Sequence, residues 1–142
     1  MLFLRMGRMA QNVNMGFGFT KLIVSDVDSL FRFYARVFGL AEVARVQQGD
    51  GADALDEIIM GAAGTGYATP TLVLQRYPNR PVPAPGEATL GFVVPNVDAT
   101  VATALSAGGS IHRAAQTQSH HGVKVAFIKD SDGHLIEVVQ ML

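Results

Sequence analysis

The chain has 142 residues, 49% hydrophobic and 16% charged, which is typical of a single soluble globular domain and excludes a disordered chain. Its formal net charge is −1, without a cluster of lysines or arginines, so no surface for nucleic acid is indicated. The absence of cysteine excludes disulfides, thiolate metal sites and thiol nucleophiles, and fits the reducing cytoplasm.

The first residues of the chain are interpreted as a mobile arm, 1–14, before a single domain at 15–142. The longest apolar run here covers four residues, Met1 to Leu4, which is too short for the core of a signal peptide or for a membrane helix. We therefore expect a cytoplasmic protein with no membrane partner.

Two segments of the chain are alike at an offset of 70 residues, Phe19–Leu40 and Thr89–Ser110. Each predicts a short strand, a capped turn and an amphipathic helix that ends at a glycine. The helix of the first copy carries apolar residues at helical spacing, and so does that of the second copy. The repeat predicts two modules of the same fold.

The ends of both predicted helices carry recognisable signals. Asp28 and Asp98 are the expected N-caps, because an aspartate oxygen accepts hydrogen bonds from the free amides of the first turn. Gly39 and Gly109 are expected to end the helices, because glycine adopts positive φ without strain.

Three more strands are predicted after each helix, separated by stretches rich in glycine, proline and aspartate. They lie near residues 42–47, 57–60 and 71–77, and near residues 110–113, 124–128 and 134–141. A segment with four prolines, residues 78–87, is expected to link the two halves. The sequence therefore predicts an α+β fold of two tandem βαβββ modules, about 17–77 and 88–142.

Alternation along the strands separates two faces of the predicted sheet. One face, the dry face, collects only apolar side chains, as expected beneath the helices: Leu22, Val24, Leu72, Leu74, Leu90, Phe92, Val94, Ile136 and Val138. The opposite or mixed face also carries polar groups: Phe19, Lys21, Ile23, Thr71, Val73, Gln75, Tyr77, Thr89, Gly91, Val93, Leu135, Glu137 and Val139. A ligand site is expected on the mixed face.

Three segments carry a resemblance to a known family: "VSDVDSLFRFYARVFGL", "VPNVDATVATALSAGG" and "AFIKDSDGHLIEVVQ". They resemble the vicinal oxygen chelate superfamily, which includes glyoxalase I, extradiol dioxygenases, fosfomycin-resistance enzymes and bleomycin-resistance proteins. The resemblance covers residues 17–140. It implies a U-shaped, mostly antiparallel half-barrel with helices on its convex face, usually in a homodimer, and a small-molecule site inside the cup.

The resemblance also implies where metal-using relatives hold their ion. Carried over, those positions fall on Phe19, Thr89 and Glu137, and the fourth falls on Val73 or, with a slip of one residue, on Leu74. Only Glu137 is a metal donor, whereas a catalytic divalent ion needs at least three protein donors, so we expect no conventional metal site and no cofactor. A non-standard metal site at His120 or His121, in a predicted polar loop at 114–122, stays open against a solvated loop.

Glu137 is the one carboxylate in the apolar closing strand, and its role has two interpretations. Burial would suit it as a general base, or it would anchor a ligand amine. Alternatively it pairs with Lys21 on the same face, as a remnant of a lost metal site. The pair Asp56 and Glu57 cannot share one site, because adjacent residues in a strand point opposite ways.

Other mixed-face residues are candidates for binding a ligand, with cup-lining packing as the alternative. Those expected to stack on a ligand, line its site or donate to it are Phe19, Lys21, Val73, Gln75, Tyr77 and Thr89. The favoured hypothesis is a glyoxalase-like lyase or isomerase that moves a proton next to a carbonyl, with a polar group stabilising the oxyanion. The alternative hypotheses are a binding protein of the bleomycin-resistance type and, ranked last, an inactive regulatory or assembly module.

Overall fold

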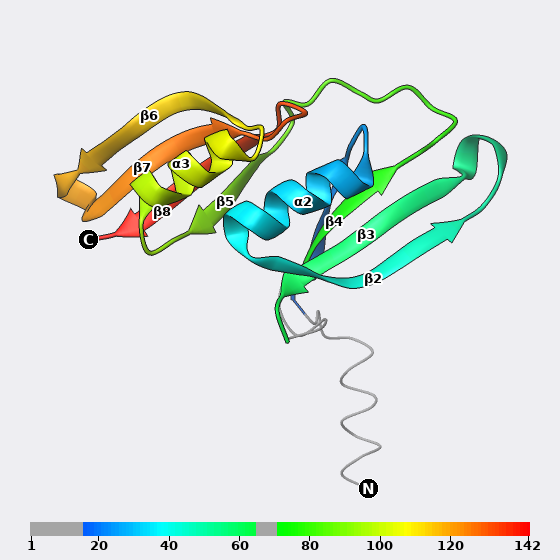
Figure 1. Ribbon diagram of the computed structural model, residues 1–142, viewed down its shortest axis with the longest axis horizontal. Helices are drawn as coiled ribbons and strands as arrows, with labels where there is room; N and C mark the ends of the chain where they lie inside the picture. The colour runs from blue at the N-terminus through cyan, green and yellow to red at the C-terminus, as the bar shows by residue number, and fades with distance from the viewer. Residues whose placement is uncertain (1–15, 65–70) are drawn as a thin grey trace, which may run out of the picture.

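The computed structural model describes residues 16–64 and 71–142, so the predicted arm at 1–14 lies outside the described residues. Two modules follow one another along the chain (Figure 1). The first consists of β1 (Phe19–Ile23), α2 (Val27–Phe38), β2 (Leu40–Gln48), a 3₁₀ turn (Gly51–Asp53), β3 (Leu55–Ala62) and β4 (Thr71–Arg76). The second consists of β5 (Thr89–Val93), α3 (Val97–Ser106), β6 (Ser110–Gln118), a 3₁₀ turn (Ser119–His121), β7 (Val123–Lys129) and β8 (Leu135–Met141).

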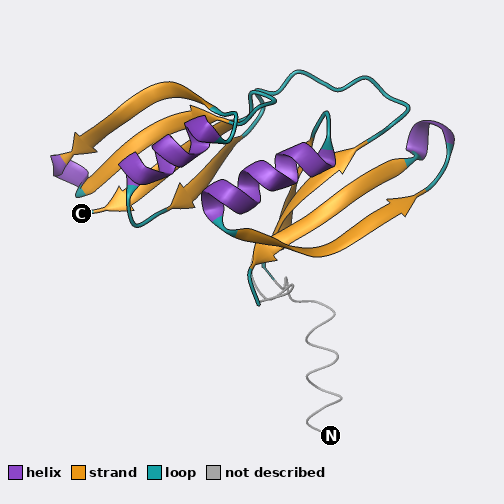
Figure 2. Cartoon of the chain, in the orientation of Figure 1, coloured by secondary structure: helices purple, strands orange, loops and turns teal. Residues whose placement is uncertain are grey.

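Each module forms its own four-stranded sheet, in the order β1-β4-β3-β2 for the first and β5-β8-β7-β6 for the second. The first strand of each module is parallel to the last, and the other pairs are antiparallel. Figure 2 shows α2 and α3 lying on the same side of the two sheets. The predicted α+β fold of two βαβββ modules is confirmed. None of the helices in the described part of the chain is long and apolar enough to cross a membrane.

The strand register repeats from one module to the other. Lys21 lies beside Val73 across β1 and β4, and Gly91 lies beside Glu137 across β5 and β8. Val73 and Glu137 therefore occupy equivalent positions, as the carry-over of the implied ligand positions requires.

The dry faces of both sheets meet in one hydrophobic core. The buried residues of this core include Leu22, Val24 and Leu74 from the first module and Ile136 and Val138 from the second. At the junction of the modules the rings of Phe38 and Phe92 stack with their centroids 3.8 Å apart. The prediction that one face of each sheet is apolar beneath the helices is confirmed.

The predicted N-caps are wrong by two residues in both helices. Asp26 caps α2 by accepting from the amide of Ser29, and Asn96 caps α3 by accepting from the amide of Ala99. Asp28 and Asp98 lie inside the first turn instead. The cap comes earlier because the first helical residue of each copy is a valine that is buried in the core.

One of the two predicted helix ends is confirmed. Gly39 has a left-handed backbone with φ of 68° and ends α2. In the second module Gly108 takes the positive φ, 94°. Gly109 is required for a different reason, since a Cβ there would lie 2.7 Å from the carbonyl oxygen of Lys129 and 2.9 Å from the ring of Phe33.

The predicted loop at 114–122 is largely wrong, because β6 extends to Gln118. This strand pairs with β7 on one side only, through a register with two irregularities, and most of its residues are exposed. An edge strand of this kind carries no apolar alternation from which a sequence could predict it. His120 and His121 follow in an exposed 3₁₀ turn.

Candidate functional site

The mixed face of the first module holds a cavity of about 250 Å³, opposite the helix side of the sheet. Its lining residues come from β1, β3 and β4: Phe19, Lys21, Glu57, Ile59, Thr71 and Val73. The structure thus brings three of the predicted site residues together, Phe19, Lys21 and Val73. Val73 is buried, whereas Phe19 is 57% exposed.

A polar cluster of Lys21, Glu57 and Gln75 crosses this face. The Lys21 ammonium donates to the Glu57 carboxylate at 2.9 Å and to the Gln75 side-chain oxygen at 3.0 Å. The Lys21 side chain is 40% exposed and that of Glu57 only 10%. The alternative that Lys21 pairs with Glu137 is therefore wrong: its carboxylate partner is Glu57, and Glu137 belongs to the other sheet.

Glu57 lines this cavity although the sequence alone does not single it out, and strand alternation contains the signal. Asp56 and Glu57 do point opposite ways, since Asp56 binds Arg45 while Glu57 binds Lys21. The same alternation places Glu57 on the mixed face. What the sequence does not show is which residue of β4 lies beside it, and the structure assigns that place to Gln75.

Tyr77 is not among the residues that line this cavity. It follows the end of β4, and the Arg80 guanidinium lies over its ring, 4.1 Å from the centroid. A cation over an aromatic face is a favourable packing arrangement. Tyr77 thus has a structural contact at the start of the linker.

Glu137 lies on the mixed face of the second module, half-buried between two unlike neighbours. On one side is Gly91, where a Cβ would meet no atom within 4 Å, and on the other is the ring of Phe127. Within the described residues, the Glu137 carboxylate has no hydrogen bond or ion pair. The Arg113 guanidinium lies over the ring of Phe127, 5.0 Å from its centroid.

Thr89 opens β5 and lies on a different hollow from the Lys21 cluster. It lines a space of about 260 Å³ between the two modules, together with Phe17. Apart from Tyr77, which follows β4, the predicted site residues therefore lie on two sheets. Those on the second sheet are Thr89 and Glu137.

The residues present do not fit a metal ion of the kind that the family positions imply. No group of three or more His, Cys, Asp or Glu side chains lies close enough to hold a metal in the described part of the chain. Residues 1–15 and 65–70 contain none of these four residue types. Glu137 is a single carboxylate, which by itself supplies too few donors for a catalytic divalent ion.

A second polar cluster joins the two modules and has a structural role. Asp130, buried in the turn before β8, accepts from the Tyr34 hydroxyl at 2.7 Å and from His134 Nδ1 at 2.8 Å. His134 Nε2 lies 3.2 Å from the carbonyl oxygen of Ile23 in the first module. Both acceptors lack a proton to give, so the ring satisfies both only as an imidazolium, and the Asp130 hydrogen bond accordingly raises the pKa of His134.

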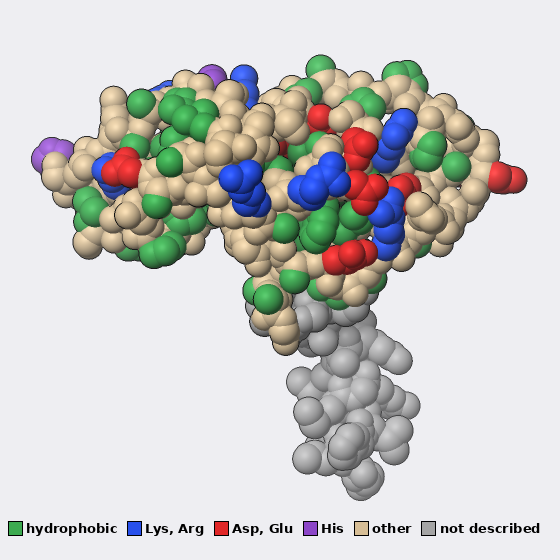
Figure 3. Space-filling model, in the orientation of Figure 1, with side chains coloured by type: hydrophobic (Ala, Val, Ile, Leu, Met, Phe, Trp, Pro, Cys, Tyr) green, Lys and Arg blue, Asp and Glu red, His purple; other side chains and the backbone are tan. Residues whose placement is uncertain are grey.

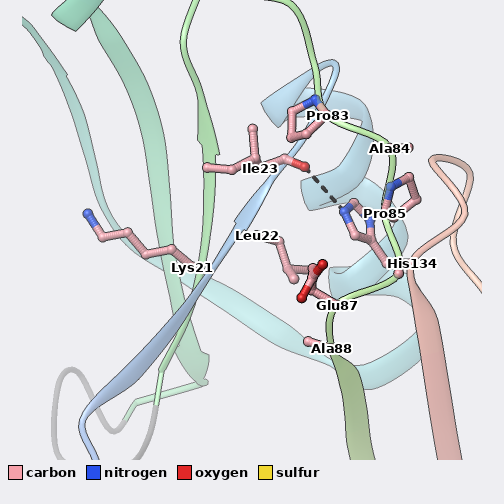
Figure 4. A pocket seen from close by; sticks show the side chains of 10 residues that line it. Lys21, Leu22, Ile23, Pro83, Ala84, Pro85, Glu87, Ala88 and His134 are labelled. Carbon is pink, nitrogen blue, oxygen red and sulfur yellow. Dashed lines mark hydrogen bonds between the residues drawn. The ribbon is translucent and has the colours of Figure 1, made fainter.

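Figure 4 shows the hollow beside this junction, about 210 Å³ in volume, between β1 and the linker. Its walls are mainly linker residues such as Pro83 and Pro85, and the Lys21 ammonium extends away from them. The hollow therefore lies apart from the Lys21 ammonium, and its other ionisable lining groups are Glu87 and the engaged His134.

Charged side chains of both signs gather over the first module on the face that carries the helices (Figure 3). There Arg45 binds Asp28 at 2.7 Å and Asp56 at 2.8 Å. Hydrogen bonds from Arg45 hold the pKa of Asp56 below its ordinary value. This ion-pair network ties α2, β2 and β3 together away from the mixed face.

Comparisons with known proteins give one family and one fold. The sequence model described as Glyoxalase/Bleomycin resistance protein/Dioxygenase superfamily matches residues 16–138. A search of curated protein sequences gives no match.

Solved structures provide the fold comparison. A glyoxalase family protein from Bacillus cereus is 18% identical with a TM-score of 0.78, over 94% of this chain and 99% of its own. Glyoxalase I from Zea mays is 20% identical with a TM-score of 0.73, over 87% of this chain and 44% of its own. A glyoxalase/bleomycin resistance protein/dioxygenase family enzyme from Burkholderia phytofirmans is 15% identical with a TM-score of 0.68, over 88% and 98%.

Proposed function

The chain belongs to the glyoxalase/bleomycin resistance protein/dioxygenase superfamily, and from this premise we propose that it takes up a small organic molecule on its mixed sheet faces. There it moves a proton next to a carbonyl group, as a lyase or isomerase, with Glu137 as the base. The observation that carries the proposal is the Glu137 carboxylate, which has no partner in the described part of the chain and faces open space at Gly91.

The surroundings of Glu137 support the role of a proton acceptor. A carboxylate already held by a cation or by amide donors gives up part of its basicity, whereas this one is uncommitted. Its neighbours across the sheet are Gly91, which has no side chain, and Phe127, which presents a flat ring. In this proposal the substrate binds beside the carboxylate with its carbon acid within hydrogen-bond reach, which is the first requirement for a general base.

The proton balance of the step is simple. Glu137 takes a proton from the carbon next to the carbonyl, and the electron pair of that bond moves onto the carbonyl oxygen as an enolate. Return of the proton to the same carbon gives exchange with solvent. With an α-hydroxy carbonyl substrate, the hydroxyl proton passes to the enolate oxygen and the proton held by Glu137 returns to the former carbonyl carbon, which completes an isomerisation. An enolate of this kind needs a hydrogen-bond donor, and the candidates are Lys21 and Gln75.

Lys21 and Gln75 belong to the other sheet, so the proposal includes a homodimer. In it the mixed face of the first module of one copy meets the mixed face of the second module of the other. A donor from one copy and the base from the other copy then share one substrate. On dilution, light scattering should show the molecular mass falling to half. The activity of the same samples should be lost as the mass falls.

The test of Glu137 is deuterium uptake from D₂O into a panel of small ketones and aldehydes, followed by ¹H NMR. The variant Glu137→Gln should lower the uptake rate by about 10²–10⁴-fold, the usual contribution of a general base, with unchanged thermal unfolding. Glu42→Gln, at an exposed glutamate of β2, is the matched control and should exchange like the parent protein. Parent-like uptake in Glu137→Gln would remove Glu137 from the mechanism.

Binding without turnover is the second candidate function. It is favoured by the cavity of the first module, whose walls are apolar around a single ion pair that already balances its own charge. A protein of this kind would raise its midpoint of thermal unfolding with a ligand, because binding to the folded state alone stabilises it. The same ligand would show no deuterium uptake.

A further inference from the structure

The polar cluster of Lys21, Glu57 and Gln75 is a feature of the first module only. The repeated register gives the equivalent positions in the second module: Gly91 for Lys21, Val125 for Glu57 and Val139 for Gln75. The second sheet forms with the same strand order and no polar group at any of the three positions. The fold therefore does not require the cluster.

Holding this cluster on the sheet carries a cost that the second module avoids. The Glu57 side chain is 10% exposed and Gln75 as a whole 3%. Taking a carboxylate out of water is unfavourable, and a buried ion pair commonly only balances that loss. A hydrophobic pair of similar volume would serve the sheet at least as well, so a ligand is the better reason for keeping the charges.

The geometry of Lys21 leaves one donor for such a ligand. An ammonium group has three N–H bonds, and Lys21 directs two of them to Glu57 and Gln75. The remaining N–H belongs to a side chain that is 40% exposed and lines the cavity of about 250 Å³. The Lys21 nitrogen lies 5.8 Å from the centroid of the Phe19 ring, so donor and ring border the same space.

The charges of the cluster select the kind of ligand. The positive Lys21 and the negative Glu57 sum to zero, so an anion entering the cavity gains from one and is repelled by the other. A neutral oxygen acceptor gains the hydrogen bond without that repulsion. The exposed ring of Phe19 and the apolar side chains of Ile59 and Val73 suit a flat, apolar body.

The structure assigns this cavity to a neutral, flat molecule whose carbonyl oxygen accepts the third Lys21 N–H, and assigns to Glu57 the selection of neutral over anionic ligands. This deepens the proposed function, since it rests on the uptake of a small molecule on the mixed face. It does not depend on the role of Glu137. Loss of the Glu57 charge turns the site into one for anions.

The test compares two probes of nearly the same shape, acetophenone and benzoate, in NMR titrations of the full chain. The parent protein should bind acetophenone more tightly. In Glu57→Gln, which keeps an oxygen for Lys21 but removes the charge, the ratio of the two dissociation constants should shift toward benzoate by at least about tenfold, since a unit charge within a few ångströms is lost.

The matched control is Asp56→Asn, the next residue of the same strand. It removes the same unit of charge on the opposite face, where Asp56 binds Arg45, and should leave the ratio unchanged. A second variant, Lys21→Met with Glu57→Val, copies the apolar character of the second module, folds without an unpaired charge and should bind acetophenone about tenfold more weakly, having lost the donor.

Several outcomes would overturn the inference. They are tighter binding of benzoate than of acetophenone by the parent protein, no binding of either probe, an unchanged ratio in Glu57→Gln, or an equal shift in Asp56→Asn. A changed ratio in Glu57→Gln together with parent-like deuterium uptake in Glu137→Gln would reject Glu137 as the base and keep the role of Glu57 in selectivity. An unchanged ratio in Glu57→Gln together with reduced uptake in Glu137→Gln would reject only the role of Glu57.

Discussion

The two modules share a strand order and a register but differ in their mixed faces. In the first module the mixed face carries Lys21, Glu57 and Gln75, and in the second it carries Glu137 at the position equivalent to Val73. The dry faces, by contrast, are apolar in both. The difference shows that the dry face and the caps specify this fold, while the mixed face is free to carry chemistry.

The glycines at the ends of the two helices give the largest expected effect on stability. Gly39 and Gly109 are aligned in the sequence repeat, but only Gly109 is packed against backbone and a ring. Gly109→Ala should lower the free energy of unfolding by about 3 kcal/mol, because the chain must shift to make room for the added methyl group. Gly39→Ala should cost only about 1 kcal/mol, from the left-handed backbone with open space around it.

Chemical unfolding of both variants measures the difference. Equal losses would mean that the two helix ends are constrained in the same way. That result would contradict the close packing that distinguishes the second module.

The polar cluster of the first module provides the next test of the comparison. Lys21→Met leaves the Glu57 carboxylate with 10% side-chain exposure and without its cation, and should destabilise the protein by about 2 kcal/mol. Adding Glu57→Val, as at the equivalent Val125, should restore most of that loss. Unfolding curves of the single and double variants at pH 7 decide this, and a double variant no more stable than Lys21→Met would show that the fold needs the cluster.

The smallest expected effect lies in the junction between the modules, where His134 binds Asp130 and the Ile23 carbonyl. The pKa of His134 is raised, by its hydrogen bond with Asp130 above all. Its contribution to stability is therefore complete below the unfolded value, about 6.5, and is lost as the pH rises through the folded pKa.

Asp130 acts with the opposite sign. Burial works to raise the pKa of its carboxyl group, but hydrogen bonds from His134 and Tyr34 outweigh burial and hold it below the ordinary value. This contribution is present above about pH 3.9 and is lost as the pH falls through the folded pKa. The junction should be strongest between about pH 4 and 6.5.

His134→Gln measures the junction directly. The free energy of unfolding of the variant should be about 1 kcal/mol lower than that of the parent protein at pH 6. This difference should disappear as the pH rises toward 9. Thermal or chemical unfolding across this range is the measurement. A gap that widens with pH would mean that the neutral ring, rather than the imidazolium, holds the modules together.

The sequence predicts the fold well because its signals repeat. The alternation that puts Leu22 and Leu74 on one face occurs again at Ile136 and Val138, and the helix stop at Gly39 is a local signal. The caps at Asp26 and Asn96 lie two residues before the predicted ones, because aspartates also occur inside the first turns. The pattern does not reveal that Gly109 is needed for close packing against distant residues.

The sequence predicts the site less well, for a reason that the Lys21 cluster makes plain. Alternation assigns a residue to a face, but the partner of Lys21 depends on strands that are 36 and 54 residues away. The pattern therefore offers Glu137 as the partner of Lys21 and does not single out Glu57. The equivalence of Val73 and Glu137, by contrast, follows from the family resemblance, and the strand registers agree with it.

The central claim is that ligands bind on the mixed faces, away from the helices. The most direct test is a ¹H–¹⁵N NMR titration of the full chain with acetophenone. We expect the shifts to concentrate at Phe19, Lys21, Glu57 and Val73 on β1, β3 and β4. Shifts that cluster on α2 and α3, or along the proline-rich linker near Pro83 and Pro85, would contradict the claim.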